Sequence, residues 1–270
     1  MHRVAALFRY PLKSAAGEEC EKLQLDHFGV EGDRRWMVTT RDGVPITQRE
    51  CPGLSQLSAR TETDSLALTW GASTFRVPLP AADSPRIAVN IWGDSVVLPL
   101  AGAESAEWIS RHLGLGAHLA YMPDDVDRPV NPRYAQAGDR TALTDGYPLH
   151  LIGSGSMEDL NSRLDQPVGV ERFRPNVYVE GPDPFAEDGW SEIRIGDCGF
   201  RVVKPCPRCT VTTIDPATGV RGKEPLRTLA AYRKTKEGVM FGQNVIHDGS
   251  GVIRVGDPVQ VFSRRDARAT

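Results

Sequence analysis

Two cysteines in the second half of the chain lie in a segment whose residues suit metal binding. Cys206 and Cys209 are separated by Pro207 and Arg208, and Lys204 precedes them. Thiolates rather than thiols bind metals, and cationic neighbours favour the ionised form of a cysteine. A cysteine also packs well as a small buried hydrophobic residue. The segment alone therefore leaves a metal-binding role and a purely structural role open.

The CxxC spacing of these cysteines allows two further interpretations. A zinc ribbon needs a second pair, but no other CxxC occurs, and Cys198 and His247 are the other candidate ligands nearby. A thioredoxin-like dithiol opens a helix, whereas the β-branched residues 210–214 predict a strand. Neither interpretation is favoured by the residues around the pair.

The cysteine count and the first residues of the chain bear on its compartment. Five cysteines are an odd number, which argues against a disulfide framework and for reduced thiols. The first apolar run, residues 4–8, ends at Arg9 and is too short for the core of a signal peptide. No stretch approaches the roughly 18 apolar residues that a membrane span needs. We therefore expect a cytoplasmic protein without a membrane partner.

The composition is that of a soluble globular protein. With 270 residues, of which 40% are hydrophobic and 25% charged, the chain can bury a core as one large or two smaller domains. A net charge of -3 produces no field strong enough to attract nucleic acid or an anionic membrane surface. Nucleic acid is therefore not an expected partner.

The first hundred residues predict strands joined by tight turns. Three alternating apolar segments read as hairpins, over residues 35–47 around Asp42-Gly43, residues 65–77 around Gly71, and residues 86–98 around Gly93-Asp94. Successive hairpins with few helices are typical of a small barrel or sandwich. A helix follows over residues 103–113, with Gly114 at its carboxyl end.

The second half mixes helices and strands after a long loop. Residues 121–144 show no period and predict a linker or functional surface, with a domain boundary near residue 118. A strand over residues 149–152 precedes a Ser-Gly turn and a helix capped by Ser156, whose terminal amides suit a phosphate although every capped helix has such amides. Another helix over residues 224–233 and closing strands over residues 240–246 and 251–259 complete the pattern.

Several separated motifs resemble those of the MOSC domain family. In the second half they are Lys204-Pro205-Cys206-Pro207-Arg208-Cys209, Arg172-Phe173-Arg174-Pro175-Asn176, Phe241-Gly242-Gln243-Asn244 and residues 251–257. In the first half, residues 10–14 and 32–36 resemble the N-terminal β-barrel domain of the same family. Within that family the chain looks like the bacterial relatives of the mitochondrial amidoxime-reducing component.

The resemblance implies a fold that is mainly β with α/β elements. It predicts a small N-terminal β-barrel-like domain over residues 1–118. It also predicts a C-terminal MOSC β-barrel domain with peripheral helices over residues 119–265.

The resemblance also implies a molybdenum cofactor, in which a pterin dithiolene and a protein cysteine bind molybdenum. The cysteine in the matching position is Cys209, and its soft sulfur suits a redox-active metal; Cys206 is expected to be structural. The phosphorylated pterin is anionic, which suits arginine, amides at a helix terminus and an asparagine side chain. The residues predicted to bind the cofactor are Lys13, Ser14, Arg34, Ser154, Gly155, Ser156, Arg174, Asn176 and Arg208, with Gln243 and Asn244 as candidates for the pocket.

The activity implied by the resemblance is reductive removal of oxygen from N-hydroxylated compounds, namely hydroxylamines, amidoximes and N-hydroxylated base analogues. Some bacterial relatives append a ferredoxin-type domain, whereas this chain stops at Thr270. We therefore expect a separate electron donor of the ferredoxin or flavin type.

Other functions remain open from the sequence. The chain is alternatively a carrier of molybdenum cofactor, or of sulfur on Cys209, without substrate turnover. A third alternative is a small-ligand binding module that has lost the metal. Pyridoxal phosphate binding is a further property that the resemblance leaves open.

Overall fold

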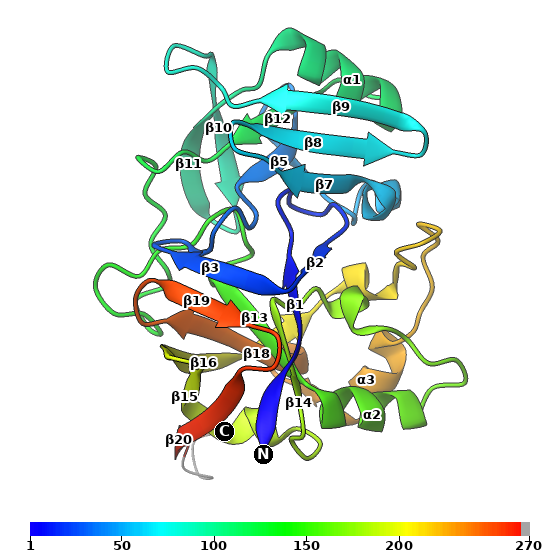
Figure 1. The fold of residues 1–270 in the computed structure, drawn as a ribbon. Helices are drawn as coiled ribbons and strands as arrows, with labels where there is room; N and C mark the ends of the chain where they lie inside the picture. Colours follow the sequence, from blue (N-terminus) through cyan, green and yellow to red (C-terminus); the bar gives the residue numbers. More distant parts are fainter. Residues whose placement is uncertain (266–270) are drawn as a thin grey trace.

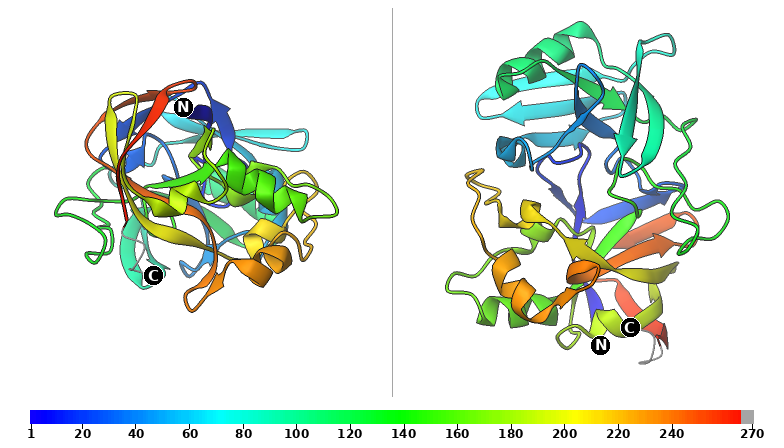
Figure 2. Two further views of the ribbon diagram at one scale, coloured as in Figure 1. Left: turned by 90° about the horizontal axis from the view of Figure 1, so that it is seen from below. Right: turned by 180° about the vertical axis from the view of Figure 1, so that it is seen from behind.

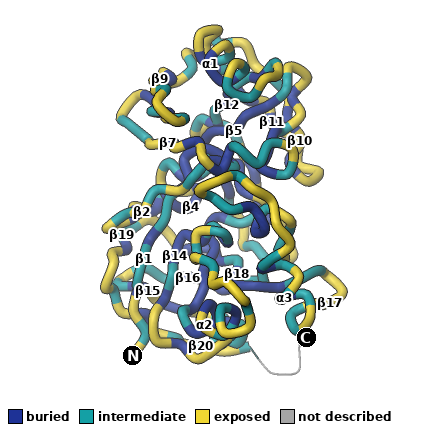
Figure 3. The backbone as a smooth tube through the Cα atoms, turned by 90° about the vertical axis from the view of Figure 1, so that its right-hand side faces the viewer, coloured by how far each residue is buried: buried dark blue, intermediate teal, exposed yellow. Residues whose placement is uncertain are grey.

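The computed structural model describes residues 1–265 and consists mainly of strands arranged in two lobes (Figure 1). The lower lobe in Figure 1 contains both ends of the described chain, and the upper lobe contains the middle of the first half. In both lobes the buried parts of the backbone run through the centre (Figure 3). No helix within residues 1–265 has the length and apolar character needed to cross a bilayer.

Seven strands of the lower lobe close into a barrel. In order of pairing they are β13 (Leu149–Gly153), β14 (Val177–Glu180), β1 (His2–Arg9), β20 (Pro258–Arg264), β15 (Trp190–Ile195), β16 (Cys198–Arg208) and β18 (Gly238–His247). The barrel closes because β18 pairs again with β13. The pair β13–β14 is parallel and the other pairs are antiparallel. The short strand β2 (Glu18–Cys20) pairs with β1, and the short strand β17 (Lys234–Thr235) pairs with β18.

The barrel is filled by apolar side chains that alternate along its strands. Leu7 of β1, Trp190 of β15 and Phe200 of β16 are almost fully buried in this core. Helices α2 (Ser154–Ser162) and α3 (Leu226–Tyr232) lie outside the barrel on one side (Figure 2). Alternation of this kind is what a closed sheet with a dry interior requires.

The upper lobe consists of small antiparallel sheets and one helix. Its sheets are β7 (Ser58–Thr61) with β8 (Ser65–Trp70) and β9 (Ser73–Pro78), β12 (Ala117–Tyr121) with β5 (Trp36–Thr40) and β6 (Pro45–Ile46), and β10 (Arg86–Ile91) with β11 (Asp94–Pro99). Helix α1 (Ala103–Leu113) packs on them and ends at Gly114, whose φ of 70° is left-handed. The three predicted hairpins and this helix are confirmed.

The first thirty residues connect the lobes. Strand β1 belongs to the barrel, and β3 (Lys22–Asp26) pairs with β4 (Gly29–Val30) and with β19 (Gly251–Arg254) from the far end of the chain. The polypeptide therefore enters the barrel lobe twice, first at its start and again from β13 onwards. Short 3-10 helices occur at Pro52–Gln56, Val170–Phe173 and Ala186–Gly189.

Two local expectations were wrong. Residues 210–214 do not form a strand, because Thr210–Thr213 is a 3-10 helix in which the Thr212 hydroxyl donates to the Cys209 carbonyl at 3.0 Å. Threonine hydroxyls that bond the local backbone compete with sheet pairing. Helix α2 begins at Ser154 with Gly153 as its N-cap, so Ser156 is not the cap and the predicted turn is the first helical turn.

Removing a core side chain of the barrel is expected to destabilise the protein strongly. Phe200→Ala removes a ring that is 1% exposed, and we expect the free energy of unfolding to fall by about 3–5 kcal/mol. Phe262→Ala is the control, because this ring on β20 is 58% exposed, and its loss is expected to stay below about 1 kcal/mol. Urea denaturation followed by circular dichroism measures both, and equal losses would contradict the assigned core.

Candidate functional site

Cys209 lies where the barrel meets the upper lobe. It follows β16 directly and caps the 3-10 helix Thr210–Thr213, and its side chain is half-buried. An N–H group of Arg49, from the loop after β6 in the upper lobe, donates to its sulfur at 3.7 Å. Both lobes therefore contribute to the surroundings of this sulfur.

A chain of charged groups positions Arg49. Asp145 accepts a hydrogen bond from Lys13 Nζ at 2.6 Å, and its second oxygen lies 3.6 Å from Arg49 Nη2. Desolvation by the surrounding protein raises the pKa of the Asp145 carboxyl, whose side chain is 61% exposed, but Lys13 and Arg49 outweigh this effect and hold the pKa below its usual value. Burial lowers the pKa of Lys13, although Asp145 opposes that shift. The carboxylate thus connects the buried Lys13 to the arginine beside Cys209.

A second polar network, next to this series of charged groups, connects the two lobes. Arg34 Nη1 donates to Asp33 at 2.6 Å and to the side-chain oxygen of Asn176 at 3.1 Å, while Arg34 Nη2 donates to the Arg174 carbonyl at 3.1 Å. The side-chain amide nitrogen of Asn176 donates to Asp33 and to the Phe8 carbonyl, each at 3.2 Å. The Asn176 side chain is therefore already bonded to the protein through both its oxygen and its nitrogen.

Arg174 keeps one unpartnered nitrogen in this network. Its Nη1 donates to the Ala15 carbonyl at 2.5 Å, whereas the buried Nη2 has no hydrogen-bond partner. Burial, with the nearby charge of Arg34, lowers the pKa of Arg174 to about 10. The Tyr10 ring lies 4.3 Å from the Arg174 guanidinium carbon, and its hydroxyl is also buried without a partner. A buried N–H of a cation without a hydrogen-bond partner is costly, so an anion is the ligand expected at Arg174 Nη2.

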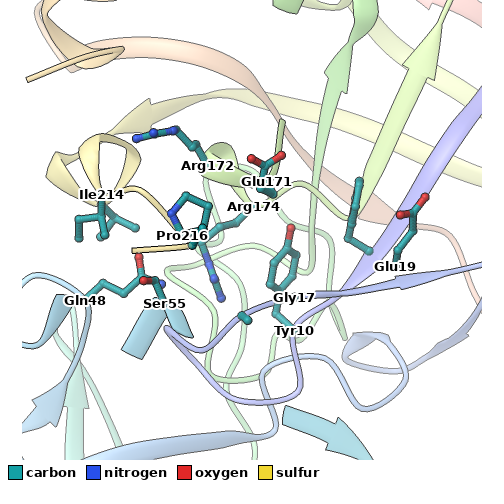
Figure 4. Close-up of a pocket in the computed structure, with 14 residues that line it drawn as sticks. Tyr10, Gly17, Glu19, Gln48, Ser55, Glu171, Arg172, Arg174, Ile214 and Pro216 are labelled. Carbon is teal, nitrogen blue, oxygen red and sulfur yellow. The ribbon is translucent and has the colours of Figure 1, made fainter. Parts of the chain in front are cut away.

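A cavity of about 390 Å³ opens next to these two groups (Figure 4). Tyr10, Gln48 and Ser55 come from the first part of the chain, and Arg172 and Arg174 come from the barrel lobe. Val211 also lines it, two residues after Cys209. The cavity is large enough for part of a small organic molecule and lies close to the cysteine.

Arg208 and Cys206 point into protein rather than into this cavity. Arg208 Nη1 lies 3.0 Å from the Cys206 sulfur and 3.3 Å from His150 Nε2, and its Nη2 donates to the Phe173 carbonyl. Burial raises the pKa of the Cys206 thiol, although Arg208 opposes the shift. Within residues 1–265, no group of three His, Cys, Asp or Glu side chains is arranged to hold a metal ion. Arg208 thus anchors the end of β16.

Several predicted residues lie outside the cluster around Cys209. The Ser156 hydroxyl is fully buried, donates to Glu187 at 2.6 Å and accepts from the Phe185 amide. A side chain at Gly155 would come within 2.4 Å of the Pro182 carbonyl, so this glycine allows close packing. Ser154 accepts from the Gly181 amide, Gln243 donates to Asp188 at 2.6 Å, and Asn244 donates to the Pro205 carbonyl at 3.4 Å.

The structure brings together Lys13, Arg34, Arg174 and Asn176, and places Cys209 next to them through Arg49. Ser14 joins this region through its carbonyl, which accepts from Gln48 at 2.7 Å. Sequence reasoning did not identify Arg49, Gln48 or Arg172 as site residues. Arg49 and Gln48 lie in a polar run after a short strand, a pattern shared by most surface turns. Only the fold shows that this turn reaches Cys209.

Profiles of two domains of the MOSC family match the two halves of the chain, which is therefore a MOSC-domain protein. The profile of the MOSC domain matches residues 138–260, and that of the MOSC N-terminal beta barrel domain matches residues 1–115. Mitochondrial amidoxime-reducing component 1 of Mus musculus is 34% identical over 281 residues, which cover 97% of this chain and 82% of that protein. The Homo sapiens protein of the same name is 33% identical, with 97% and 83% covered.

The chain therefore belongs to the family of the mitochondrial amidoxime-reducing components, and the resemblance inferred from its motifs is confirmed. Among solved structures, the YUAD protein from Bacillus subtilis matches over 98% of both chains, with 13% identity and a TM-score of 0.44.

His150 makes the stability of the protein depend on pH. Burial, reinforced by Arg208, lowers its pKa well below the usual 6.5, so the folded protein keeps it neutral while the unfolded chain protonates it below pH 6.5. The contribution of His150 to the free energy of unfolding is therefore fully present above pH 6.5. It falls with decreasing pH, by up to about 1.4 kcal/mol per pH unit. We expect His150→Gln to flatten the decline between pH 6.5 and 5.

Urea denaturation of both proteins across that range measures the difference. Burial also lowers the pKa of His247, but His247 is present in both proteins and its contribution cancels. Parallel stability curves for the two proteins would show that His150 is not the group responsible.

Proposed function

We propose that this protein is a molybdenum-cofactor-dependent reductase of N-hydroxylated compounds such as amidoximes and hydroxylamines. The observation that carries the proposal is the position of Cys209, beside a cavity whose wall holds the unpartnered nitrogen of Arg174. Relatives that match nearly the whole chain are named amidoxime-reducing components. A soft metal ligand close to a site for an anion suits a metal bound to a phosphorylated pterin.

The residues around the cavity fit such a cofactor. Arg174 Nη2 and the Tyr10 hydroxyl are donors without partners, which suits the phosphate or a polar edge of the pterin. Cys209 would provide the thiolate ligand to the metal. When bound, the molybdenum centre supplies the two-electron reduction, which with two protons converts an N–OH group to N–H and releases water.

The chain itself holds the charges around this chemistry. Arg49 keeps a positive charge against the Cys209 sulfur and is oriented by Asp145, which Lys13 fixes from the buried side. Because the pKa of Asp145 is lowered, this carboxylate stays ionised at neutral pH and accepts rather than donates hydrogen bonds. The electrons come from a separate donor protein of the ferredoxin or flavin type.

Replacing Cys209 is expected to abolish the reductase activity. Cys209→Ala removes the metal ligand, so we expect turnover of benzamidoxime with an artificial reductant to fall by more than about a hundredfold, together with the molybdenum content. Cys206→Ala is the matched control from the same CxxC pair and is expected to keep most of the activity. Molybdenum analysis and product chromatography measure both effects.

Two results would contradict the proposal. Full activity of Cys209→Ala would remove the sulfur from the mechanism. Wild-type protein that carries and exchanges molybdenum cofactor without reducing benzamidoxime would instead indicate a carrier.

Replacing Arg174 is expected to weaken cofactor retention. Arg174→Gln removes a charge-assisted hydrogen bond worth about 1.5–3 kcal/mol, so the pterin should dissociate at least about tenfold more readily. Iodine oxidation of the released pterin to its fluorescent derivative quantifies it after dialysis. Arg163→Gln is the control, because Arg163 pairs with Asp159 on the surface of α2. Equal pterin loss from both variants would show that Arg174 does not contact the cofactor.

A further inference from the structure

Trp92 occupies a backbone position that disfavours it. Strands β10 and β11 are joined by the two residues Trp92 and Gly93, since Ile91 pairs with Asp94. Both turn residues have positive φ, 55° and 104°, as in a type I′ turn. Such turns prefer Asn-Gly, because a bulky residue in the left-handed region is strained. A tryptophan at this place is not explained by the turn.

The side chain of Trp92 is not explained by packing either. The residue is 68% exposed, more than any other exposed tryptophan, phenylalanine or leucine within residues 1–265. None of the four apolar clusters in that part of the chain includes it. Burying little surface, it contributes little to the hydrophobic stability of the hairpin. A strained and exposed aromatic residue therefore needs another reason to be there.

The surroundings of Trp92 connect it to Cys209. The Arg49 guanidinium carbon lies 5.0 Å from the Trp92 ring centroid, and Arg49 Nη2 donates to the Cys209 sulfur. The Asp145 carboxylate lies 3.6 Å from the same Arg49 Nη2. The indole therefore makes a cation–π contact with the same arginine that donates to the Cys209 sulfur, and it still exposes most of its surface.

We propose that Trp92 is a substrate-binding residue whose exposed indole stacks on planar, conjugated N-hydroxylated substrates, such as aryl amidoximes, next to Cys209. This inference rests on the proposed reductase function. Flat π-systems stack on an exposed aromatic side chain largely independently of their substituents. Small N-hydroxylated compounds without a π-system, such as hydroxylamine, cannot use this surface. Trp92 therefore favours conjugated N-hydroxylated substrates over small ones such as hydroxylamine, although both undergo the same reduction.

The variant Trp92→Asn tests the inference without threatening the fold, because asparagine is preferred at this turn position. We expect the KM for benzamidoxime to rise about tenfold, equivalent to about 1.4 kcal/mol, with kcat changed less than about twofold. The KM for hydroxylamine should stay unchanged. Trp92→Phe should keep most of the affinity for benzamidoxime. Val97→Asn, at a 51% exposed apolar position of the same hairpin, is the matched control and should change neither KM.

Binding without turnover provides a second measurement. Calorimetric titration of the oxidised holoenzyme with benzamidoxime should give a Kd about tenfold weaker for Trp92→Asn than for the wild type. The melting temperature of Trp92→Asn should equal or exceed that of the wild type, by up to about 2 °C, because strain is relieved. A melting temperature several degrees lower would show a structural role and overturn the inference.

The outcomes distinguish this inference from the proposed function. Equal increases in KM for benzamidoxime and hydroxylamine, or no change in either, would overturn the role of Trp92 while the reductase assignment stands. A wild-type protein that binds benzamidoxime through Trp92 but reduces neither compound would contradict the proposed reductase function and leave the binding role of Trp92 intact. A wild-type protein that does not bind benzamidoxime would overturn the role of Trp92.

Discussion

The buried contact of Arg34 with Asp33 and Asn176 is the interaction on which the rest of the site depends. Asp33 is 3% exposed, and burial raises the pKa of its carboxyl although Arg34 opposes the shift. Buried charges are costly unless their hydrogen bonds are satisfied. Here Arg34 and Asp33 pair with each other, and both bond the Asn176 side chain across the junction of the two lobes. The network therefore specifies one arrangement of the lobes more than it adds stability.

The same network explains why Arg174 is available to a ligand. Arg34 holds the Arg174 carbonyl, and the Ala15 carbonyl occupies Arg174 Nη1, so the guanidinium is fixed with one nitrogen left over. Both Arg34 and Arg174 adopt left-handed backbone conformations, with φ of 46° and 56°. Strain of this kind in non-glycine residues is typical of functional sites, where the surrounding contacts impose it. A fixed cation facing a cavity binds an anion without the cost of ordering a flexible side chain.

The upper lobe contributes chemistry as well as shape. Arg49 and Trp92 both come from this lobe. Arg49 donates to the Cys209 sulfur at the end of a barrel strand, and Trp92 contacts Arg49. The barrel thus supplies the cysteine and the anion site, while the upper lobe supplies the cation and the exposed indole. This division is physically reasonable, because loops tolerate substitution better than a closed barrel does.

The sequence by itself determined the strand-rich fold, the three hairpins of the first half and helix α1, since turn residues and periodicity act over a few residues. Its motifs also indicated Cys209 and Arg174, whose residue types are needed for their chemistry. Only the tertiary structure decided that Thr210–Thr213 is helical, that the Ser156 hydroxyl donates to Glu187, that Arg49 lies at Cys209, and that Trp92 packs against Arg49. These outcomes depend on contacts between segments distant in the sequence, such as Arg49 with Cys209, 160 residues apart, and Ser156 with Glu187, 31 apart, or on competing local hydrogen bonds, and neither leaves a local pattern in the chain.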